Sequence, residues 1–317
     1  MLIVGEGGTG KSKLLKAVMM LYEENGTFTL LAKTVTTGVT SSLKGGGMVH
    51  SWAGIPIKTL QTDWWATNPR PDMAAHRRTN ILDKLLLTID KMSLLTTDNL
   101  SLISKVMSIV KSVDSTIDST IPFGGLSVAM IGDFHQFPPV GKRNRALFSR
   151  KPPSRHCEVG RNLYLQIKTV TRLTQQMQIT DKPWMDILDR ARYGECTRED
   201  LDEIRKLVLT EWRCNIPDFG SPPWDNAVLI TPRNVVQIRW NAEAVLKHCR
   251  STGSVLYISP AKDSSKGEPL TTYQQYLAAQ LPVKDTADLD MQIQLAVGLK
   301  MMITENISTS AHLSNSS

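Results

Sequence analysis

The octapeptide GEGGTGKS, residues 5–12, lies between a short apolar stretch and a segment with helical periodicity that ends near Gly26. It fits the pattern G-x-x-x-x-G-K-[ST] in the strand–loop–helix setting that this pattern requires. Glycines let backbone N–H groups surround phosphate oxygens, and the dipole of the following helix favours negative charge. The octapeptide therefore predicts a phosphate-binding loop in an α/β fold.

The residue types of this loop predict individual roles in nucleotide binding. Lys11 is expected to reach the β- and γ-phosphates, and the Ser12 hydroxyl to bind Mg²⁺. The residues expected to hold the nucleotide are Gly5, Gly7, Gly8, Thr9, Gly10, Lys11 and Ser12. Because kinases, GTPases and helicases all begin with such a loop, the loop alone does not choose among them.

Composition narrows the class of protein further. The 317 residues include 37 Lys and Arg against 30 Asp and Glu, a net charge of +7 that suits a polyanionic partner without proving one. The four cysteines lie far apart and form no CxxC pair, which argues against a zinc site or a disulfide framework. No apolar run approaches the roughly 20 residues of a membrane helix. We expect a soluble intracellular protein without a membrane partner.

Two polar regions after the loop allow more than one interpretation. Residues 34–55, TVTTGVTSSLKGGGMVHSWAGI, follow an expected strand over 27–34 and lead into a short helix. Their hydroxyls and amides suit either nucleic-acid phosphates or an ordinary polar connection. Trp64 and Trp65 precede a basic cluster, and could stack bases or anchor a small subdomain. The arginines of that cluster, candidates for phosphate contacts, are Arg70, Arg77 and Arg78.

Acidic residues follow two apolar stretches that read as buried strands. LLLTIDKMSLL, residues 85–95, places Asp90 at a strand end, and LSVAMIGDFHQFPPVG, residues 126–141, places Asp133 just after Gly132. The carboxyl ends of parallel strands are where open α/β sheets bind ligands. Gln136 is expected to sense a γ-phosphate or position water, on a loop that prolines stiffen. We expect residues 99–111 to form a packing helix, and His135 to be structural.

These motifs, in this order, resemble the petite-integration-frequency (PIF-type) DNA helicases of superfamily 1. The match continues through LTQQMQITDKPWMDILDRARYGECTRED, AVLITPRNVVQIRWN and LAVGLKMMITENIS, so it covers almost the whole chain. The amino-acid sequence of residues 179–234 is similar to that of the helicase modules of Helitron-type transposons.

The resemblance implies an α/β P-loop NTPase with two RecA-like parallel-sheet domains and ATP, with Mg²⁺, between them. Residues 1–150 would form the first domain with a small insertion, and 151–317 an incomplete second domain with a variable insertion at about 251–290. Single-stranded DNA or DNA junctions would be the partner, with 5′-to-3′ translocation by a monomer. A nuclear location and roles in DNA repair, recombination and telomere maintenance are implied by the same family.

The resemblance also assigns site residues by matching position. Lys11, Asp90 and Gln136 would be catalytic, and Asp90 would join Ser12 as a magnesium ligand. Asp133 and Gln136 would couple the γ-phosphate to DNA. Residues expected on the DNA path or in second-domain motifs are Thr37, Gly38, His50, Ser51, Asn234, Asn241, Thr304 and Asn306.

The chain departs from the family pattern at two catalytic positions. Lys91 stands where the family has the Glu that activates water, a contribution of about 10²–10⁴-fold. A lysine with a reference pKa near 10.4 cannot accept that proton. Gln178 stands where related helicases have an Arg that reaches the γ-phosphate, and losing such a cation costs about 10³–10⁵ in rate. Arg172 lies near in sequence but is not expected to replace it.

The resemblance also predicts that the upstream glutamine motif and the final Arg-bearing motif fall outside this chain. Three hypotheses stay open: a working ATP-dependent DNA helicase, a module that binds nucleotide and DNA with little hydrolysis, and a partly folding remnant of a transposon helicase.

Overall fold

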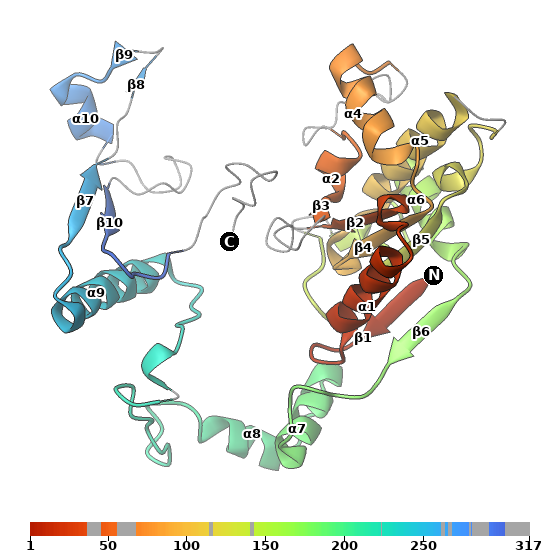
Figure 1. Ribbon diagram of the computed structural model, residues 1–317. Coiled ribbons are helices and arrows are strands. Elements are labelled where there is room, and N and C mark those ends of the chain that lie inside the picture. The colour runs from red at the N-terminus through yellow and green to blue at the C-terminus, as the bar shows by residue number, and fades with distance from the viewer. Residues whose placement is uncertain are drawn as a thin grey trace. The chain divides into compact units, whose positions relative to one another are not determined.

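The computed structural model describes residues 1–36, 46–55, 68–113, 117–139, 143–222, 224–260, 264–265, 268–278, 280 and 292–301. The described chain divides into two compact units, residues 1–202 and residues 203–301 (Figure 1).

The first unit is built on a parallel sheet of six strands in the order β3-β2-β4-β5-β1-β6. The strands are β1 (Leu2–Gly5), β2 (Leu31–Val35), β3 (Gly46–Met48), β4 (Leu86–Asp90), β5 (Ser127–Gly132) and β6 (Val170–Leu173). The helices are α1 (Lys11–Glu24), α2 (Val49–Trp52), α4 (Pro71–Ile81), α5 (Thr97–Val113), α6 (Arg155–Leu165), α7 (Lys182–Tyr193) and α8 (Arg198–Arg205), which runs into the second unit.

Successive side chains of the strands point to opposite faces of the sheet, and both faces are apolar. A different set of helices covers each face. Leu87 and Ile89 of β4 are fully buried in the larger core cluster, together with Ile103 of α5. Ile3 of β1 and Ile131 of β5 pack instead with Leu15 of α1. Burying each such side chain contributes about 1.5–3 kcal/mol to the stability of the fold, so the helices on both faces of the sheet stabilise its central strands. This is the two-sided parallel sheet that the near-continuous apolar runs of the sequence predict.

The register of the central strands brings the candidate site residues to one edge of the sheet. Asp90 lies beside Ile131, and Val4 lies beside Gly132. The phosphate loop after β1, the acid that ends β4 and the acid that follows β5 therefore share the carboxyl edge. The expected strand ends at Asp90 and Gly132, the helix after the loop and the helix over 99–111 are confirmed.

Two features of the first unit differ from the sequence prediction. The strand expected over 27–34 begins only at Leu31, because residues 28–30 form a 3₁₀ turn. The boundary expected after residue 150 lies later, at residue 202. The reason is that β6 pairs with β1 along its whole length, which ties residues beyond 150 to the first sheet.

The second unit contains one long helix and short antiparallel pairs among its described residues. Helix α9 (Asn234–Thr252) ends at Gly253, whose φ of 70° suits a glycine at a helix C-terminus. Strands β7 (Tyr257–Pro260) and β10 (Gln292–Leu295) pair antiparallel, as do β8 (Ser264–Ser265) and β9 (Glu268–Pro269), followed by α10 (Thr272–Ala278). An incomplete RecA-like second domain with an insertion at about 251–290 stays a prediction.

Candidate functional site

The loop between β1 and α1 turns through two glycines with left-handed backbone. Gly8 has φ of 86° and Gly10 has φ of 88°, conformations that residues with a side chain adopt only at a cost. The Thr9 hydroxyl donates to the carbonyl of Glu6 at 2.9 Å and closes the loop on itself. Helix α1 then begins at Lys11, so its free N–H groups face the end of the loop.

The Lys11 side chain folds back into this loop. Its ammonium donates to the carbonyls of Gly5, at 2.9 Å, and of Glu6, at 2.6 Å. Burial lowers the pKa of Lys11, and the nearby charges of Asp133 and Asp90 act in the opposite direction. A cation is thus held at the centre of the loop, where phosphate oxygens would take over its hydrogen bonds.

The two neighbouring glycines of the loop give a matched test of its geometry. A Cβ on Gly8 would lie 2.0 Å from Oε1 of Gln176, whereas a Cβ on Gly7 meets nothing within 4 Å. We expect Gly8→Ala to lower the free energy of unfolding by about 1–2 kcal/mol, because left-handed backbone disfavours a side chain. Gly7→Ala is expected to stay within about 0.5 kcal/mol. Urea unfolding of both variants measures the difference, and equal effects would contradict this loop geometry.

Asp90 is suited to a magnesium ion that also contacts phosphate. The residue is 8% exposed, and one carboxylate oxygen accepts the backbone N–H of Lys91 at 2.8 Å. Ser12 is exposed in the first turn of α1. Mg²⁺ usually takes one or two protein ligands and completes its shell with water and phosphate. Among the residues that the structure describes, no cluster of three or more His, Cys, Asp or Glu could hold a metal. The Asp90 carboxylate and the Ser12 hydroxyl are oxygen donors of the kind that Mg²⁺ takes beside phosphates.

Lys91 has an unusual backbone and lies close to Gln136. Its φ of 57° and ψ of 46° are left-handed, which costs a non-glycine residue about 1–2 kcal/mol. Lys91 and Gln136 both line a hollow of about 430 Å³, together with Ser93, Leu94, His135, Phe137 and Pro138. Lys91 and Gln136, which is expected to position water, thus line the same hollow.

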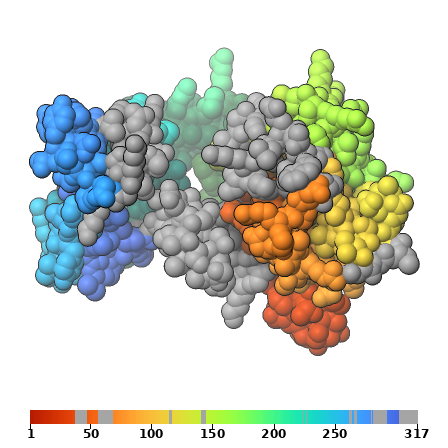
Figure 2. All heavy atoms as spheres, turned by 90° about the horizontal axis from the view of Figure 1, so that it is seen from above, coloured from red at the N-terminus to blue at the C-terminus, as the bar shows by residue number. Residues whose placement is uncertain are grey.

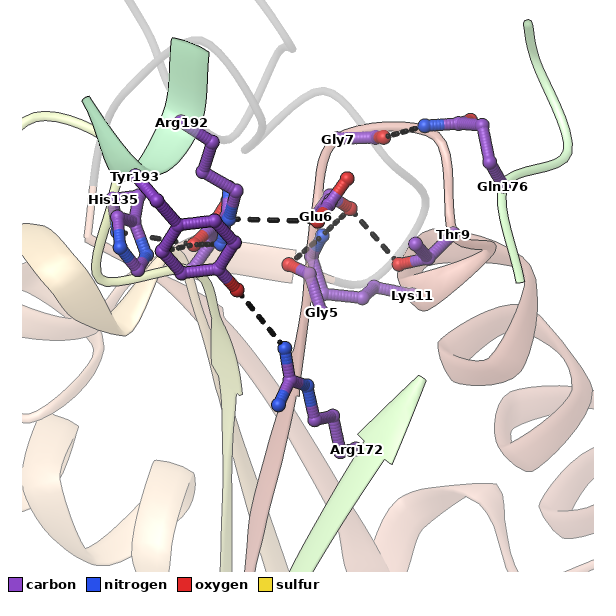
Figure 3. Close-up of polar contacts among 11 residues, drawn as sticks. Gly5, Glu6, Gly7, Thr9, Lys11, His135, Arg172, Gln176, Arg192 and Tyr193 are labelled. Carbon is purple, nitrogen blue, oxygen red and sulfur yellow. Dashed lines mark hydrogen bonds and ion pairs between the residues drawn. The ribbon is translucent and has the colours of Figure 1, made fainter. Parts of the chain in front are cut away.

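Asp133 is clamped by an arginine from α7. Arg192 donates to both carboxylate oxygens of Asp133, at 2.5 and 2.9 Å, and its Nε lies 3.5 Å from the carboxylate of Glu6 in the loop (Figure 3). Burial alone would raise the pKa of Asp133, but the hydrogen bonds from Arg192 and from the His135 backbone N–H hold it below its usual value. Asp133 is therefore a buried anion tied to both α7 and the phosphate loop.

The residue after Arg192 extends this contact. The ring of Tyr193 packs edge-on against His135, with centroids 5.4 Å apart, and its hydroxyl accepts a hydrogen bond from Arg172 at 3.1 Å (Figure 3). Arg172 is therefore engaged beside the site. His135 is exposed, and its structural role stays a prediction. Sequence reasoning assigned no role to Arg192 or Tyr193. The only available signal was their place in RARYGEC, within a stretch that resembles the helicase family.

The segment after β6 runs along the outside of the loop. Gln176 donates to the carbonyl of Gly7 at 2.8 Å, and the backbone N–H of Met177 donates to the carbonyl of Gly8 at 3.0 Å (Figure 3). Gln178, at the position of the family's arginine, is exposed, and its backbone N–H donates to Oε1 of Gln176 at 3.0 Å. The segment that carries Gln178 is thus anchored to the phosphate loop.

The candidate DNA-contacting residues are distributed over both units. Thr37, Gly38, Thr304 and Asn306 lie outside the described residues. Ser51 is exposed on α2, whereas His50 is half-buried, and burial lowers the pKa of His50 despite a hydrogen bond with Asn99. In the second unit, Asn234 and Asn241 are exposed on α9, and their spacing of two helical turns puts them on one face.

The basic cluster after the tryptophan pair is only partly available to a ligand. Arg77 is 2% exposed and donates to the carbonyl of Gly54 at 3.1 Å, which favours a structural role for this arginine over a contact with nucleic-acid phosphate. Its guanidinium instead holds α4 against the end of α2. Arg70, which precedes α4, and Arg78, within α4, are both exposed. Figure 2 shows this helix at the surface in orange. Trp64 and Trp65 lie outside the described residues.

Comparison with known proteins assigns a family to this geometry. The family model described as PIF1-like helicase matches residues 1–201. ATP-dependent DNA helicase RRM3 of Saccharomyces cerevisiae is 30% identical over 206 residues, which are 64% of this chain and 26% of that protein. ATP-dependent DNA helicase PIF1 of Xenopus laevis is 26% identical over 312 residues, covering 98% of this chain and 42% of that protein. The chain thus spans less than half the length of either relative.

Solved structures show the same fold. A Pif1 structure described as the basis for unwinding of forked DNA by two coordinating helicases matches with a TM-score of 0.60 and 20% identity, over all of this chain and 65% of that one. Bacteroides Pif1 bound to single-stranded DNA matches with a TM-score of 0.59 and 20% identity, over 98% of this chain and 62% of that one. These likenesses identify an α/β RecA-like P-loop fold. No helix among the described residues is both long and apolar enough to cross a membrane.

Proposed function

Because this chain belongs to the PIF1-like helicase family, we propose that it binds ATP with Mg²⁺ and single-stranded DNA as an ATP-dependent helicase module, and that its own hydrolysis is slow. The observation that carries the proposal is the convergence on one sheet edge of the Lys11 loop, the Asp90 carboxylate and the clamped Asp133. Translocation from 5′ to 3′ and a nuclear location are part of the proposal through the family alone.

The described residues support a separate role for each group in nucleotide binding. The loop amides and the start of α1 would accept the phosphates, and the Lys11 ammonium would exchange its two carbonyl partners for phosphate oxygens. Ser12 and Asp90 would hold Mg²⁺, whose chemistry is to neutralise charge on the β- and γ-phosphate oxygens. Asp133 is fixed by Arg192 of α7, which also lies near the loop. This link would make the position of α7 sensitive to phosphate bound in the loop.

Two residues support slow hydrolysis. Lys91 brings a positive charge to the hollow that it shares with Gln136, where a base would have to accept a proton from water. Gln178 is neutral, so its side chain cannot compensate charge that develops on the γ-phosphate. Each change acts on the transition state more than on the bound nucleotide, so binding should survive while turnover falls. A relation to Helitron transposons, based on residues 179–234, is a further hypothesis.

Oligonucleotide binding tests the DNA part of the proposal. We expect a fluorescently labelled oligothymidylate to bind with an affinity that falls roughly tenfold or more between 50 and 200 mM salt, because phosphate contacts release counterions. Fluorescence anisotropy measures the affinity. Addition of a non-hydrolysable ATP analogue with Mg²⁺ should change it, and EDTA should remove that effect. Binding that is absent, or that ignores both salt and nucleotide, would contradict the proposal.

A further inference from the structure

Gln176 has a fixed side-chain orientation beside the phosphate loop. Its Oε1 accepts the backbone N–H groups of Met177, at 3.1 Å, and of Gln178, at 3.0 Å. With the oxygen held by two donors, the amide nitrogen is left to donate, and it does so to the carbonyl of Gly7 at 2.8 Å. The hydrogen-bond network thereby assigns the oxygen and nitrogen of this amide without ambiguity.

The loop carbonyls that this segment binds are consecutive. Gly7 is held by the side chain of Gln176, and Gly8 by the backbone of Met177 at 3.0 Å. A Cβ on Gly8 would lie 2.0 Å from the Gln176 amide oxygen, so a side chain at Gly8 would displace this amide. The register of β6 beside β1, with Leu173 next to Gly5, delivers the segment to this place.

Because a peptide group is planar, these contacts to carbonyls also fix the direction of the N–H on the opposite side of the same peptide. In a trans peptide the carbonyl of one residue and the N–H of the next point in opposite directions. Holding the Gly7 carbonyl toward Gln176 therefore turns the Gly8 N–H away from Gln176, into the loop that also holds the Lys11 ammonium. Glycine peptides rotate easily, so this orientation requires an external partner.

We propose that Gln176 is a positioning residue that orients the Gly7–Gly8 peptide so that the Gly8 N–H is available to a nucleotide phosphate. This inference rests on the proposed function and adds a residue to it. The part of the chain that carries Gln178 would then have a second role, which is independent of any contact between Gln178 and the γ-phosphate. Gln176 donates to the loop at the Gly7 carbonyl, on the side away from the Gly8 N–H.

A near-isosteric variant without a donor tests the inference. Gln176→Met should weaken binding of a fluorescent non-hydrolysable ATP analogue about fivefold to tenfold, the equivalent of one hydrogen bond. Gln176→Glu keeps the acceptor oxygens, lacks the donor and adds a carboxylate beside the phosphates. Its loss should be larger, and should shrink as salt rises. Gln175→Met, at the exposed neighbouring position, is the matched control and should bind normally.

The outcomes separate this inference from the function on which it rests. The melting temperature of each variant should stay within about 2 °C of wild type, because the contact lies on the surface. A fall in nucleotide affinity without a fall in melting temperature supports the positioning role. Wild-type affinity in Gln176→Met, or a loss that follows lowered stability, overturns it. A wild-type protein that fails to bind the analogue would overturn the proposed function as well.

Discussion

Replacing Lys11 with alanine should weaken binding of ATP with Mg²⁺ by about 10²-fold or more. A hydrogen bond to a charged group contributes about 1.5–3 kcal/mol, and two such bonds are available from this ammonium. The same two bonds brace the loop when no nucleotide is bound, so their loss also leaves the Gly5 and Glu6 carbonyls without that cation. Isothermal titration calorimetry with a non-hydrolysable analogue measures the change.

Lys13→Ala is the matched control for this variant. Lys13 lies on the same helix with an exposed side chain, and its replacement removes the same charge. It should change nucleotide affinity by less than about threefold, which is the scale of a surface charge. If Lys11→Ala and Lys13→Ala bound nucleotide equally well, the phosphate-loop assignment would be wrong.

Replacing Lys91 with glutamate should raise DNA-stimulated ATP hydrolysis by about 10-fold to 10²-fold. A carboxylate at this position would face the hollow shared with Gln136 and could take a proton from water. The gain should be only part of the roughly 10²–10⁴ that a general base contributes, because Gln178 still supplies no cation. Phosphate release at saturating nucleotide and oligonucleotide measures the rate.

Three further variants separate base chemistry from charge. Lys91→Gln removes the ammonium without adding a base and should leave hydrolysis near the wild-type rate. Lys13→Glu makes the same change of charge elsewhere on the first unit and should also have little effect. Lys91→Glu combined with Gln178→Arg should exceed Lys91→Glu alone. An equal rise with glutamine and with glutamate would show that Lys91 acts only through its charge.

Local signals made much of the first unit predictable. The glycines of residues 5–12, the apolar run that ends in Asp90 and the strand before Asp133 each encode their own element. Because parallel strands share a carboxyl edge, three such elements were enough to predict that their ends meet. The convergence of these residues was predictable for this reason, whereas their role in nucleotide binding and catalysis stays a prediction.

Contacts between distant segments were not predictable from these signals. The clamp of Arg192 on Asp133 joins residues 59 positions apart, and Gln176 reaches Gly7 across 169 positions. Neither side chain has a local pattern that distinguishes it from its polar neighbours. The later boundary of the first unit has the same cause, since the pairing of β6 with β1 depends on two stretches far apart in the sequence. The role of Arg77 stayed open in the sequence because a basic cluster does not reveal which of its members is buried.

Single-turnover hydrolysis by the wild-type chain measures how far Lys91 and Gln178 slow this site. Saturating protein would be mixed with radiolabelled ATP, Mg²⁺ and an oligonucleotide, with nucleotide binding measured in the same samples. We expect full binding with a hydrolysis rate below about 0.1 s⁻¹, since the median enzyme turns over at about 10 s⁻¹ and the base contributes at least about 10²-fold. A rate above about 1 s⁻¹ that disappears in Lys11→Ala would show that Lys91 and Gln178 do not impair this site.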